Sequence, residues 1–387
     1  MLLRSLLGLI LSIASLSAGS FPLWSPDTPV PSTSEMYRLN ETTFSVIKER
    51  TPEKDGFNWL HGVALVFHDQ RLLASFGHNS GKENTAGEMA NGRYSADRGN
   101  RWESLFRINA QELPELAVSH GVYLSTPDTL FAFHGAFHGS MNSVHTRAYQ
   151  LDETSGRWNP MGSIIAQGFW PMQEPQRLDN DQWAMAGLCV HGGIGKGDNP
   201  PGIAFNDGKD FLNWKLVTIP RPATLEIWGE STLIHQGGNL LCISRYRQPM
   251  ALVSRSSDFG KTWTPLEKSN LPMTASKPYA GRLSTGHPYL VANCAADSMN
   301  RRYPLTIAIG APGTLQFNRM AIIRNAIDIG PGESDPNAAL AYPYAIEHDG
   351  SLYIGYSNSG GRGGNRNSAE LAIVSIAELT SLEPFAP

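Results

Sequence analysis

Charged residues and cysteines are scarce in this chain of 387 residues. Asp, Glu, Lys and Arg together make up 17% of it, and the formal net charge is −4. This balance excludes a basic nucleic-acid-binding surface spread over the whole chain, so we expect no nucleic-acid partner. The three cysteines, Cys189, Cys242 and Cys294, lack the spacing of metal ligands. We therefore expect no metal ligands and no cofactor, and nothing indicates a structural divalent cation.

Long apolar runs are also absent, with one exception at the start of the chain. Arg4 precedes an apolar run from Leu6 to Leu16, and small residues follow that run. It is too short to span a bilayer well, so we interpret residues 1–20 as a secretory signal peptide rather than a retained anchor. The proline-rich residues 21–40 are expected to form an extended leader. The protein is then secreted or periplasmic, with no integral membrane segment after signal removal.

Glycine and proline, in contrast, are frequent. The chain holds 38 Gly and 26 Pro, and its hydrophobic content of 41% is sufficient for a globular core. Together with the low charge, this composition favours many strands joined by many turns and disfavours long charged helices. We expect an all-β fold.

Two sets of spacings indicate an internal repeat. Four tryptophans lie 56, 56 and 49 residues apart, and the cysteines lie 53 and 52 residues apart: Trp102, Trp158, Trp214, Trp263; Cys189, Cys242, Cys294. A period near fifty suits a four-stranded propeller blade. The cysteines are then expected at equivalent buried positions in successive blades, unpaired.

Strand-like segments divide the chain into six predicted blades. These cover residues 61–108, 117–164, 170–219, 226–268, 278–323 and 341–376. The last blade lacks a fourth strand, and the unassigned segment 42–48 can supply it and close the ring. Such closure leaves no free sheet edge. We predict a six-bladed β-propeller over residues 41–387, with seven blades as the alternative.

One segment carries a complete family motif. Residues 256–263, from Ser256 to Trp263, read Ser-Ser-Asp-Phe-Gly-Lys-Thr-Trp, and residues 95–102 form a second copy with Arg101 in place of Thr. These segments resemble the Asp box of the sialidase, or BNR-repeat, superfamily. The Ser and Asp side chains of such a box cap backbone N–H groups of a hairpin turn. We therefore expect structural rather than catalytic roles for Asp97 and Asp258.

The resemblance extends over nearly all of the chain after residue 20. Residues 77–85, 342–347 and 352–357 are similar to bacterial sialidase-like proteins. The superfamily contains sialidases, other exo-glycosidases, uronate lyases and binding proteins, so the fold does not fix the chemistry. The resemblance implies a carbohydrate substrate. This chain lacks the Arg-Ile-Pro motif that supplies the first arginine of the sialidase carboxylate-binding triad, which argues against sialic acid.

Many of the candidate site residues lie in loops that a propeller gathers on one face, while His120 and His134 lie at strand ends and Arg147, Arg245 and Arg282 lie near inner or second strands. These loops join the second and third strands of each blade, or one blade to the next. Neutral imidazoles exchange protons near pH 7, and guanidinium groups bind carboxylates through paired hydrogen bonds. Candidate catalytic groups are His78, His120, His134, Glu83, Glu174 and Tyr246. Candidate substrate-binding groups are Asn79, His138, Arg147, His191, Arg245, Arg247, Arg282 and Arg362.

Two mechanisms fit this composition. A glycoside hydrolase needs a carboxyl pair, or a tyrosine nucleophile activated by glutamate. Its further candidates are Glu226, Glu230 and Glu347, with Tyr279 or Tyr344. A uronate lyase would neutralise the substrate carboxylate with arginine and transfer protons with histidine and tyrosine. We favour hydrolysis of an acidic glycan, with the lyase and a non-catalytic glycan-binding propeller as alternatives.

Overall fold

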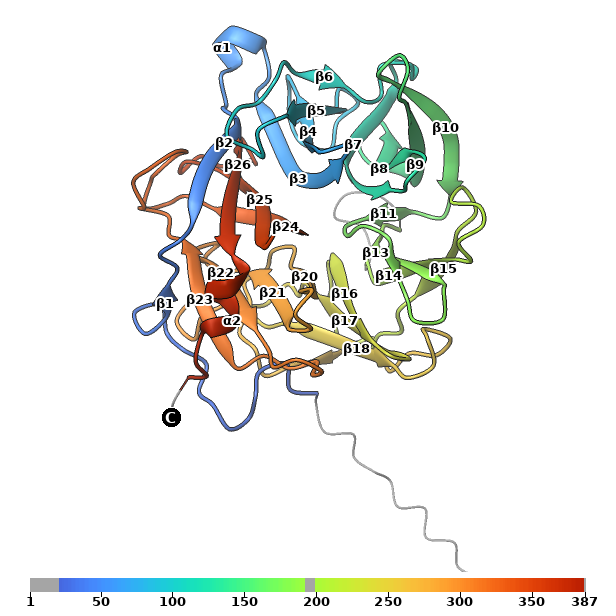
Figure 1. Cartoon of the computed structure of the whole chain (residues 1–387). Helices are drawn as coiled ribbons and strands as arrows, with labels where there is room; N and C mark the ends of the chain where they lie inside the picture. Colours follow the sequence, from blue (N-terminus) through green and yellow to red (C-terminus); the bar gives the residue numbers. More distant parts are fainter. Residues whose placement is uncertain (1–20, 192–198, 386–387) are drawn as a thin grey trace, which may run out of the picture.

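The protein forms a six-bladed β-propeller in a computed structural model that describes residues 21–191 and 199–385. Six small, mainly antiparallel sheets stand around one central axis (Figure 1). The prediction of six blades is therefore confirmed. Among the described residues, no helix is long and apolar enough to cross a membrane. The predicted signal peptide, residues 1–20, lies outside the described residues.

Blades 1 to 3 follow one another along the chain. Blade 1 contains β3 (Trp59–His68), β4 (Arg71–Asn79), β5 (Met89–Ser95) and β6 (Phe106–Arg107). Blade 2 contains β7 (Leu116–Ser125), β8 (Leu130–His138), β9 (Asn142–Asp152) and β10 (Arg157–Ile165). Blade 3 contains β11 (Phe169–Pro171), β12 (Gln176–Arg177), β13 (Trp183–Cys189), β14 (Pro201–Asn206) and β15 (Lys215–Thr218). Blade 3 opens with two short strands and not one long strand, because Pro171 and Pro175 lack the N–H groups that a continuous strand donates.

Blades 4 to 6 complete the ring. Blade 4 contains β16 (Ser231–Gln236), β17 (Asn239–Ser244), β18 (Leu252–Ser256) and β19 (Glu267–Lys268). Blade 5 contains β20 (Tyr279–Arg282), β21 (Pro288–Ala292), β22 (Leu305–Ile309) and β23 (Arg319–Arg324). Blade 6 contains β24 (Leu340–His348), β25 (Ser351–Asn358) and β26 (Ser368–Ser375). Two short helices, α1 (Pro52–Asp55) and α2 (Ile376–Ser381), lie outside the sheets.

The ring closes between the two ends of the chain. Strand β2 (Thr43–Lys48) pairs antiparallel with β26, which confirms that segment 42–48 completes blade 6. The blue β2 lies beside the red β26 in Figure 1. The preceding segment, expected to be an extended leader, packs on blade 5: β1 (Tyr37–Arg38) pairs parallel with β23, and Trp24 is 1% exposed.

Apolar side chains between the blades hold the ring together. The largest cluster joins Phe76 of blade 1, Phe133 of blade 2 and Ile354 of blade 6, all fully buried. Each such side chain contributes roughly 1.5–3 kcal/mol by leaving water. The three cysteines are buried and free, as the repeat predicted.

Both Asp boxes form the expected turns. The Ser256 hydroxyl accepts the Gly260 N–H at 2.8 Å, and Asp258 accepts the Thr262 N–H at 2.9 Å. In the second copy, Ser95 and Asp97 make the matching bonds to Gly99 and Arg101, both at 2.8 Å. Each box joins the third and fourth strands of its blade, so it faces away from the loops described next.

Candidate active site

The candidate site is centred on a tyrosine, a glutamate and an arginine from two blades. The Tyr342 hydroxyl donates a hydrogen bond to Glu230 Oε1. Arg245 Nη1 donates to Glu230 Oε2 at 2.8 Å and to the Tyr342 oxygen at 3.3 Å. Glu230 is 3% exposed and Tyr342 is 7% exposed. The phenol therefore donates its hydrogen bond to a buried carboxylate that a guanidinium holds in place.

A strained bulge aims Tyr342 at this partner. Strand β24 pairs regularly with β25 except between Ala341 and Tyr344, where the register shifts. Tyr342 lies inside this bulge with φ 57°, a left-handed conformation that costs a non-glycine residue free energy. Such strain persists only where the surroundings enforce it, and it collects at functional sites. The backbone thus singles out Tyr342 among the tyrosines of the site.

The innermost strands of blades 1 and 2, β3 and β7, also contain bulges. Register shifts occur between His61 and Ala64 in β3, and between Val118 and Gly121 in β7. Gly62 has φ 71°, and a Cβ there would lie 2.3 Å from the His120 ring. Only glycine therefore lets the two histidine-bearing strands approach this closely.

Two neutral histidines lie against Tyr342. The His61 ring centroid is 3.8 Å from that of Tyr342, and the His120 centroid is 6.0 Å from it. Burial lowers the pKa of His61 well below its usual range and lowers the pKa of His120 to about 3. Both Nε2 atoms lack a hydrogen-bond partner among the described residues. His61 Nδ1 accepts from Asn367 Nδ2 at 3.1 Å, so its proton belongs on Nε2.

Glu83 approaches the same group from the loop between β4 and β5. Asn79 shapes that loop: its side chain accepts the Gly81 N–H at 2.9 Å and donates to the Lys82 carbonyl at 2.8 Å. Asn365, from the β25–β26 loop, donates to Glu83 Oε2 at 2.9 Å. Burial, together with the negative charge of Glu230, raises the pKa of Glu83. Glu83 is thus placed to carry a proton at a higher pH than an ordinary carboxyl.

The guanidinium group of Arg302 and the indole of Trp228 lie next to Tyr342 and Glu230. The Arg302 Cζ atom lies 5.9 Å from the centre of the Tyr342 ring, and its Nη2 donates to the Ala275 carbonyl at 3.1 Å. Trp228 Nε1 donates to Glu230 Oε1 at 3.1 Å. The positive charges of Arg245 and Arg302 each lower the pKa values of Glu83 and Tyr342, against the larger effect of burial. This positive charge favours an anionic ligand.

A second tyrosine–glutamate pair lies beside the first. The Tyr279 hydroxyl donates to Glu174 Oε2, and the rings of Tyr279 and Tyr344 are 4.7 Å apart. Burial raises the pKa of Glu174, while Tyr279 opposes that shift by donating its hydrogen bond. The charge of Lys277 interacts with the carboxylates of both pairs, Glu230 and Glu174.

Among the catalytic candidates from the sequence, His120 lies against Tyr342 and Glu83 lies within electrostatic range of Glu230, while Glu174 belongs to the second pair with Tyr279. His78 instead stacks on Phe57 at 3.8 Å inside blade 1. His134 is fully buried behind His120 and bonds the Ser119 carbonyl at 2.7 Å. Tyr246 belongs to the apolar core of blades 3 and 4, away from this group.

Among the substrate-binding candidates, only Arg245 belongs to the central group. Arg147 pairs with Glu112 at 2.6 Å, and Arg362 pairs with Glu333 at 2.6 Å. Arg282 bonds the carbonyls of His235, Gly286 and Thr314 at the opposite ends of the strands.

The remaining substrate-binding candidates line the outer part of the loops. His138 and His191 are exposed, and residues 192–198 lie outside the described part of the chain. Arg247 is exposed, with its Cζ atom 6.0 Å from the Trp228 ring. Asn79 acts on the site through the shape of the Glu83 loop.

Glu230 was expected only as one of several hydrolase carboxyl candidates, and neither Tyr342 nor Lys277 was expected in the site. Tyr342 begins a segment that resembles sialidase-like proteins, and that segment was the signal that could have identified it. Its left-handed backbone cannot be expected of a tyrosine before proline.

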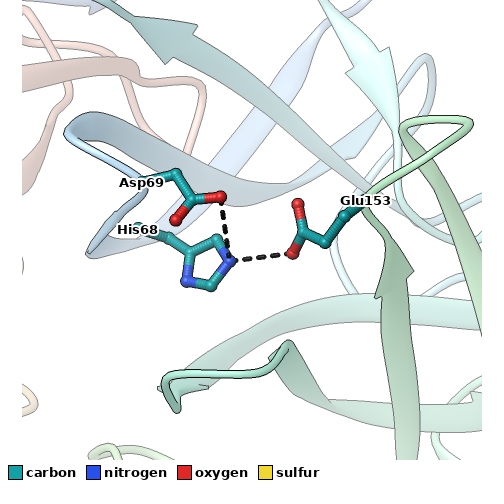
Figure 2. A group of neighbouring side chains, drawn as sticks. All are labelled: His68, Asp69 and Glu153. Carbon is teal, nitrogen blue, oxygen red and sulfur yellow. Dashed lines mark hydrogen bonds and ion pairs between the residues drawn. The ribbon is translucent and has the colours of Figure 1, made fainter.

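A separate cluster lies at the opposite ends of the strands (Figure 2). His68 Nε2 is 2.8 Å from Glu153 Oε1 and 4.0 Å from Asp69 Oδ2. Among the described residues, this is the group of three side chains close enough to share a metal ion. His68 Nδ1 already contacts the Ser125 hydroxyl at 2.8 Å. Both ring nitrogens are therefore engaged, and the cluster joins the hairpins of blades 1 and 2.

Comparison with known proteins agrees with this architecture. A family model described as a BNR repeat-like domain matches residues 70–354. The chain therefore belongs to the BNR repeat-like family. No curated protein sequence matches the chain.

Solved sialidase structures share the fold at low sequence identity. The Hadza microbial sialidase Hz136 superposes with a TM-score of 0.65 and 13% identity, covering 87% of this chain and 69% of that one. The Trypanosoma rangeli sialidase gives a TM-score of 0.63 and 14% identity, covering 88% of this chain and 60% of its own. The K499G mutant of NanB sialidase from Streptococcus pneumoniae gives 0.61 and 10%, covering 96% and 73%. At these identities the likeness establishes the fold alone.

Proposed function

We propose that this protein is a retaining glycosidase that hydrolyses an acidic glycan, with Tyr342 as the nucleophile. The observation that carries the proposal is the hydrogen bond from the Tyr342 hydroxyl to Glu230, braced by Arg245. Burial and the Glu230 charge raise the pKa of Tyr342 far above its usual range, so the phenol is neutral at rest. A neutral nucleophile with an attached base can approach an anionic sugar without the repulsion that a carboxylate would suffer.

Two arginines support the choice of an acidic substrate. Arg245 and Arg302 lie on the same side of the propeller as Glu83, and no acidic residue among the described ones pairs with Arg302. Arg302 therefore retains donors for a substrate carboxylate. In sialidases the first strand would carry the arginine of the Arg-Ile-Pro motif. In this chain the corresponding strand, β3, carries His61 beside Tyr342. A uronate-type acid suits two guanidinium groups and two neutral imidazoles.

The reaction would proceed in two balanced steps. In the first, the Tyr342 oxygen attacks the anomeric carbon while Glu230 takes the phenol proton, and Glu83 gives its proton to the departing glycosidic oxygen. In the second, water attacks the same carbon, Glu83 takes a water proton, and Glu230 returns the proton to the released tyrosine. The raised pKa of Glu83 suits the first step because the carboxyl must be protonated there.

The uronate lyase remains a second candidate because of the histidines. Burial keeps His61 and His120 unprotonated near pH 7, as a base for proton abstraction requires. Tyr342, however, donates its hydrogen bond to a carboxylate and not to either imidazole.

We also propose export from the cytoplasm, on the basis of the apolar run within residues 1–20.

One digestion series tests the function. The protein without residues 1–20 is incubated with sialyl-lactose, a panel of uronate-containing plant and algal polysaccharides, and gum arabic. New reducing ends without ultraviolet absorbance support a hydrolase, and a rise in both indicates an unsaturated uronate and therefore a lyase. Glu230→Gln, which keeps the shape of the side chain, should abolish the activity. Binding without any cleavage would support a non-catalytic propeller and overturn the proposal.

A further inference from the structure

Lys277 is a buried cation that the proposed reaction does not use directly. Its side chain is 3% exposed and precedes β20 at the centre of the ring. Its Nζ atom donates to the Pro343 carbonyl at 2.7 Å and lies 5.2 Å and 5.7 Å from the ring centres of Tyr279 and Tyr344. An ammonium group is rarely buried without a reason.

The electrostatic surroundings of Lys277 come from several blades. Burial lowers the pKa of Lys277 to about 7, while the carboxylates of Glu230 and Glu174 oppose that shift. Its positive charge in turn lowers the pKa values of His61 and His120, which face it from β3 and β7. The charge of Lys277 thus interacts with both glutamates and helps to keep the neighbouring imidazoles neutral.

The hydrogen bond from Lys277 reaches the bulge that holds Tyr342. Pro343 follows Tyr342 directly, and its carbonyl lies inside the register shift of β24. A residue before proline in the left-handed region is strained, because proline disfavours compact conformations of its predecessor. The bulge therefore needs an external bond to persist, and the ammonium group supplies one.

We propose that Lys277, in its protonated form, is a positioning residue that holds the β24 bulge and so keeps the Tyr342 hydroxyl on Glu230. This inference rests on the proposed function, because it concerns the same nucleophile. Deprotonation removes the charge that attracts Glu230 and Glu174 and weakens the bond to Pro343. Activity should then fall as the pH rises above about 7, where this lysine loses its proton.

Two groups can cause activity to fall as the pH rises, so the effect of deprotonating Lys277 must be separated from the effect of deprotonating Glu83. An aryl glycoside of the sugar identified in the digestion series has a leaving group that needs little protonation, so the Glu83 limb should disappear from its pH profile. The alkaline limb that remains then reports on Lys277. In Lys277→Met, kcat should fall roughly tenfold or more with little change in KM, because the nucleophile is misplaced while the substrate is still bound.

Lys277→Arg provides the conservative variant, because a guanidinium stays protonated across the accessible pH range. It should recover part of kcat and extend activity to higher pH. Lys215→Met, at an exposed position on β15, is the matched control and should leave kcat and the pH profile unchanged. Unchanged kcat in Lys277→Met would overturn the proposal, as would an alkaline limb that both Lys277 variants retain.

A structural measurement keeps this inference distinct from the proposed function. The crystal structure of Lys277→Met should show Tyr342 relaxed out of the left-handed region and detached from Glu230. An unchanged bulge with Tyr342 still bonded to Glu230 would overturn the positioning role. Lack of turnover by the unmodified protein would overturn the proposed function instead, and the crystal structure would still decide the role of Lys277.

Discussion

Two tyrosine–glutamate pairs lie side by side in this propeller, yet their surroundings differ. Tyr342 and Glu230 lie beside Arg245, and the tyrosine occupies a strained bulge. Tyr279 begins β20 in regular pairing with Val291 and is fully buried. A hydrogen bond between phenol and carboxylate therefore does not by itself mark a nucleophile. Backbone strain and an adjacent guanidinium separate the pair suited to chemistry from the pair suited to support.

The largest expected effect separates the two tyrosines. Tyr342→Phe removes the attacking oxygen and should lower kcat by about 10³-fold or more, which is the scale of lost nucleophilic and acid–base catalysis. Tyr279→Phe removes only a supporting bond to Glu174 and should change kcat several-fold at most. Steady-state kinetics on the cleaved glycan measure both. Equal losses in the two variants would remove the distinction between the pairs.

Glu83→Gln should give the next largest loss. Removal of the general acid should lower kcat/KM by about 10²–10³-fold on the natural glycan. The loss should shrink greatly on an aryl glycoside, whose leaving group needs no proton. In the unmodified enzyme, activity on the natural glycan should fall as the pH rises through the raised pKa of Glu83. An equal loss on both substrates would assign Glu83 a role other than proton donation.

Arg245→Met should have a smaller effect, because it removes bonds to Glu230 and Tyr342 but leaves both reacting groups present. We expect kcat/KM to fall about 100-fold, in line with roughly 1.5–3 kcal/mol for hydrogen bonds to charged groups. Arg157→Met, at an exposed position on β10, is the matched control. Arg245→Met with unchanged kinetics would show that Tyr342 and Glu230 need no guanidinium.

The smallest effect on activity is expected in the Asp box. Hydrogen bonds from the Thr262 side chain and backbone, and from Ser256, lower the pKa of Asp258 to about 2. Its folded pKa lies below its unfolded value, so its stabilising contribution is present above about pH 4 and is lost as the pH falls toward 2. Asp258→Asn should lower the thermal midpoint by a few degrees at pH 7 and leave kcat unchanged at 25 °C. A loss of kcat in the folded variant would contradict a purely structural box.

Most of the fold could be predicted because it repeats along the sequence. The spacing of tryptophans and cysteines indicated the blades, and the missing fourth strand of blade 6 indicated closure by residues 42–48. The site was less predictable, because its members are joined across the ring. Tyr342 and Glu230 are 112 residues apart, and no local pattern marks their contact. Arg282, for example, could bind a carboxylate as any arginine can, but it lies at the strand ends on the side of the propeller opposite the candidate site.

The most direct test of the account is to trap its covalent intermediate. The protein is incubated with 2,3-difluorosialic acid and, separately, with a 5-fluoro-uronosyl fluoride, and the digested peptides are examined by mass spectrometry. The account predicts a sugar adduct on the peptide that contains Tyr342, present in Tyr279→Phe and absent in Tyr342→Phe. An adduct on Tyr279 or on a carboxylate would contradict it. Turnover with inverted stereochemistry and no adduct would contradict it equally.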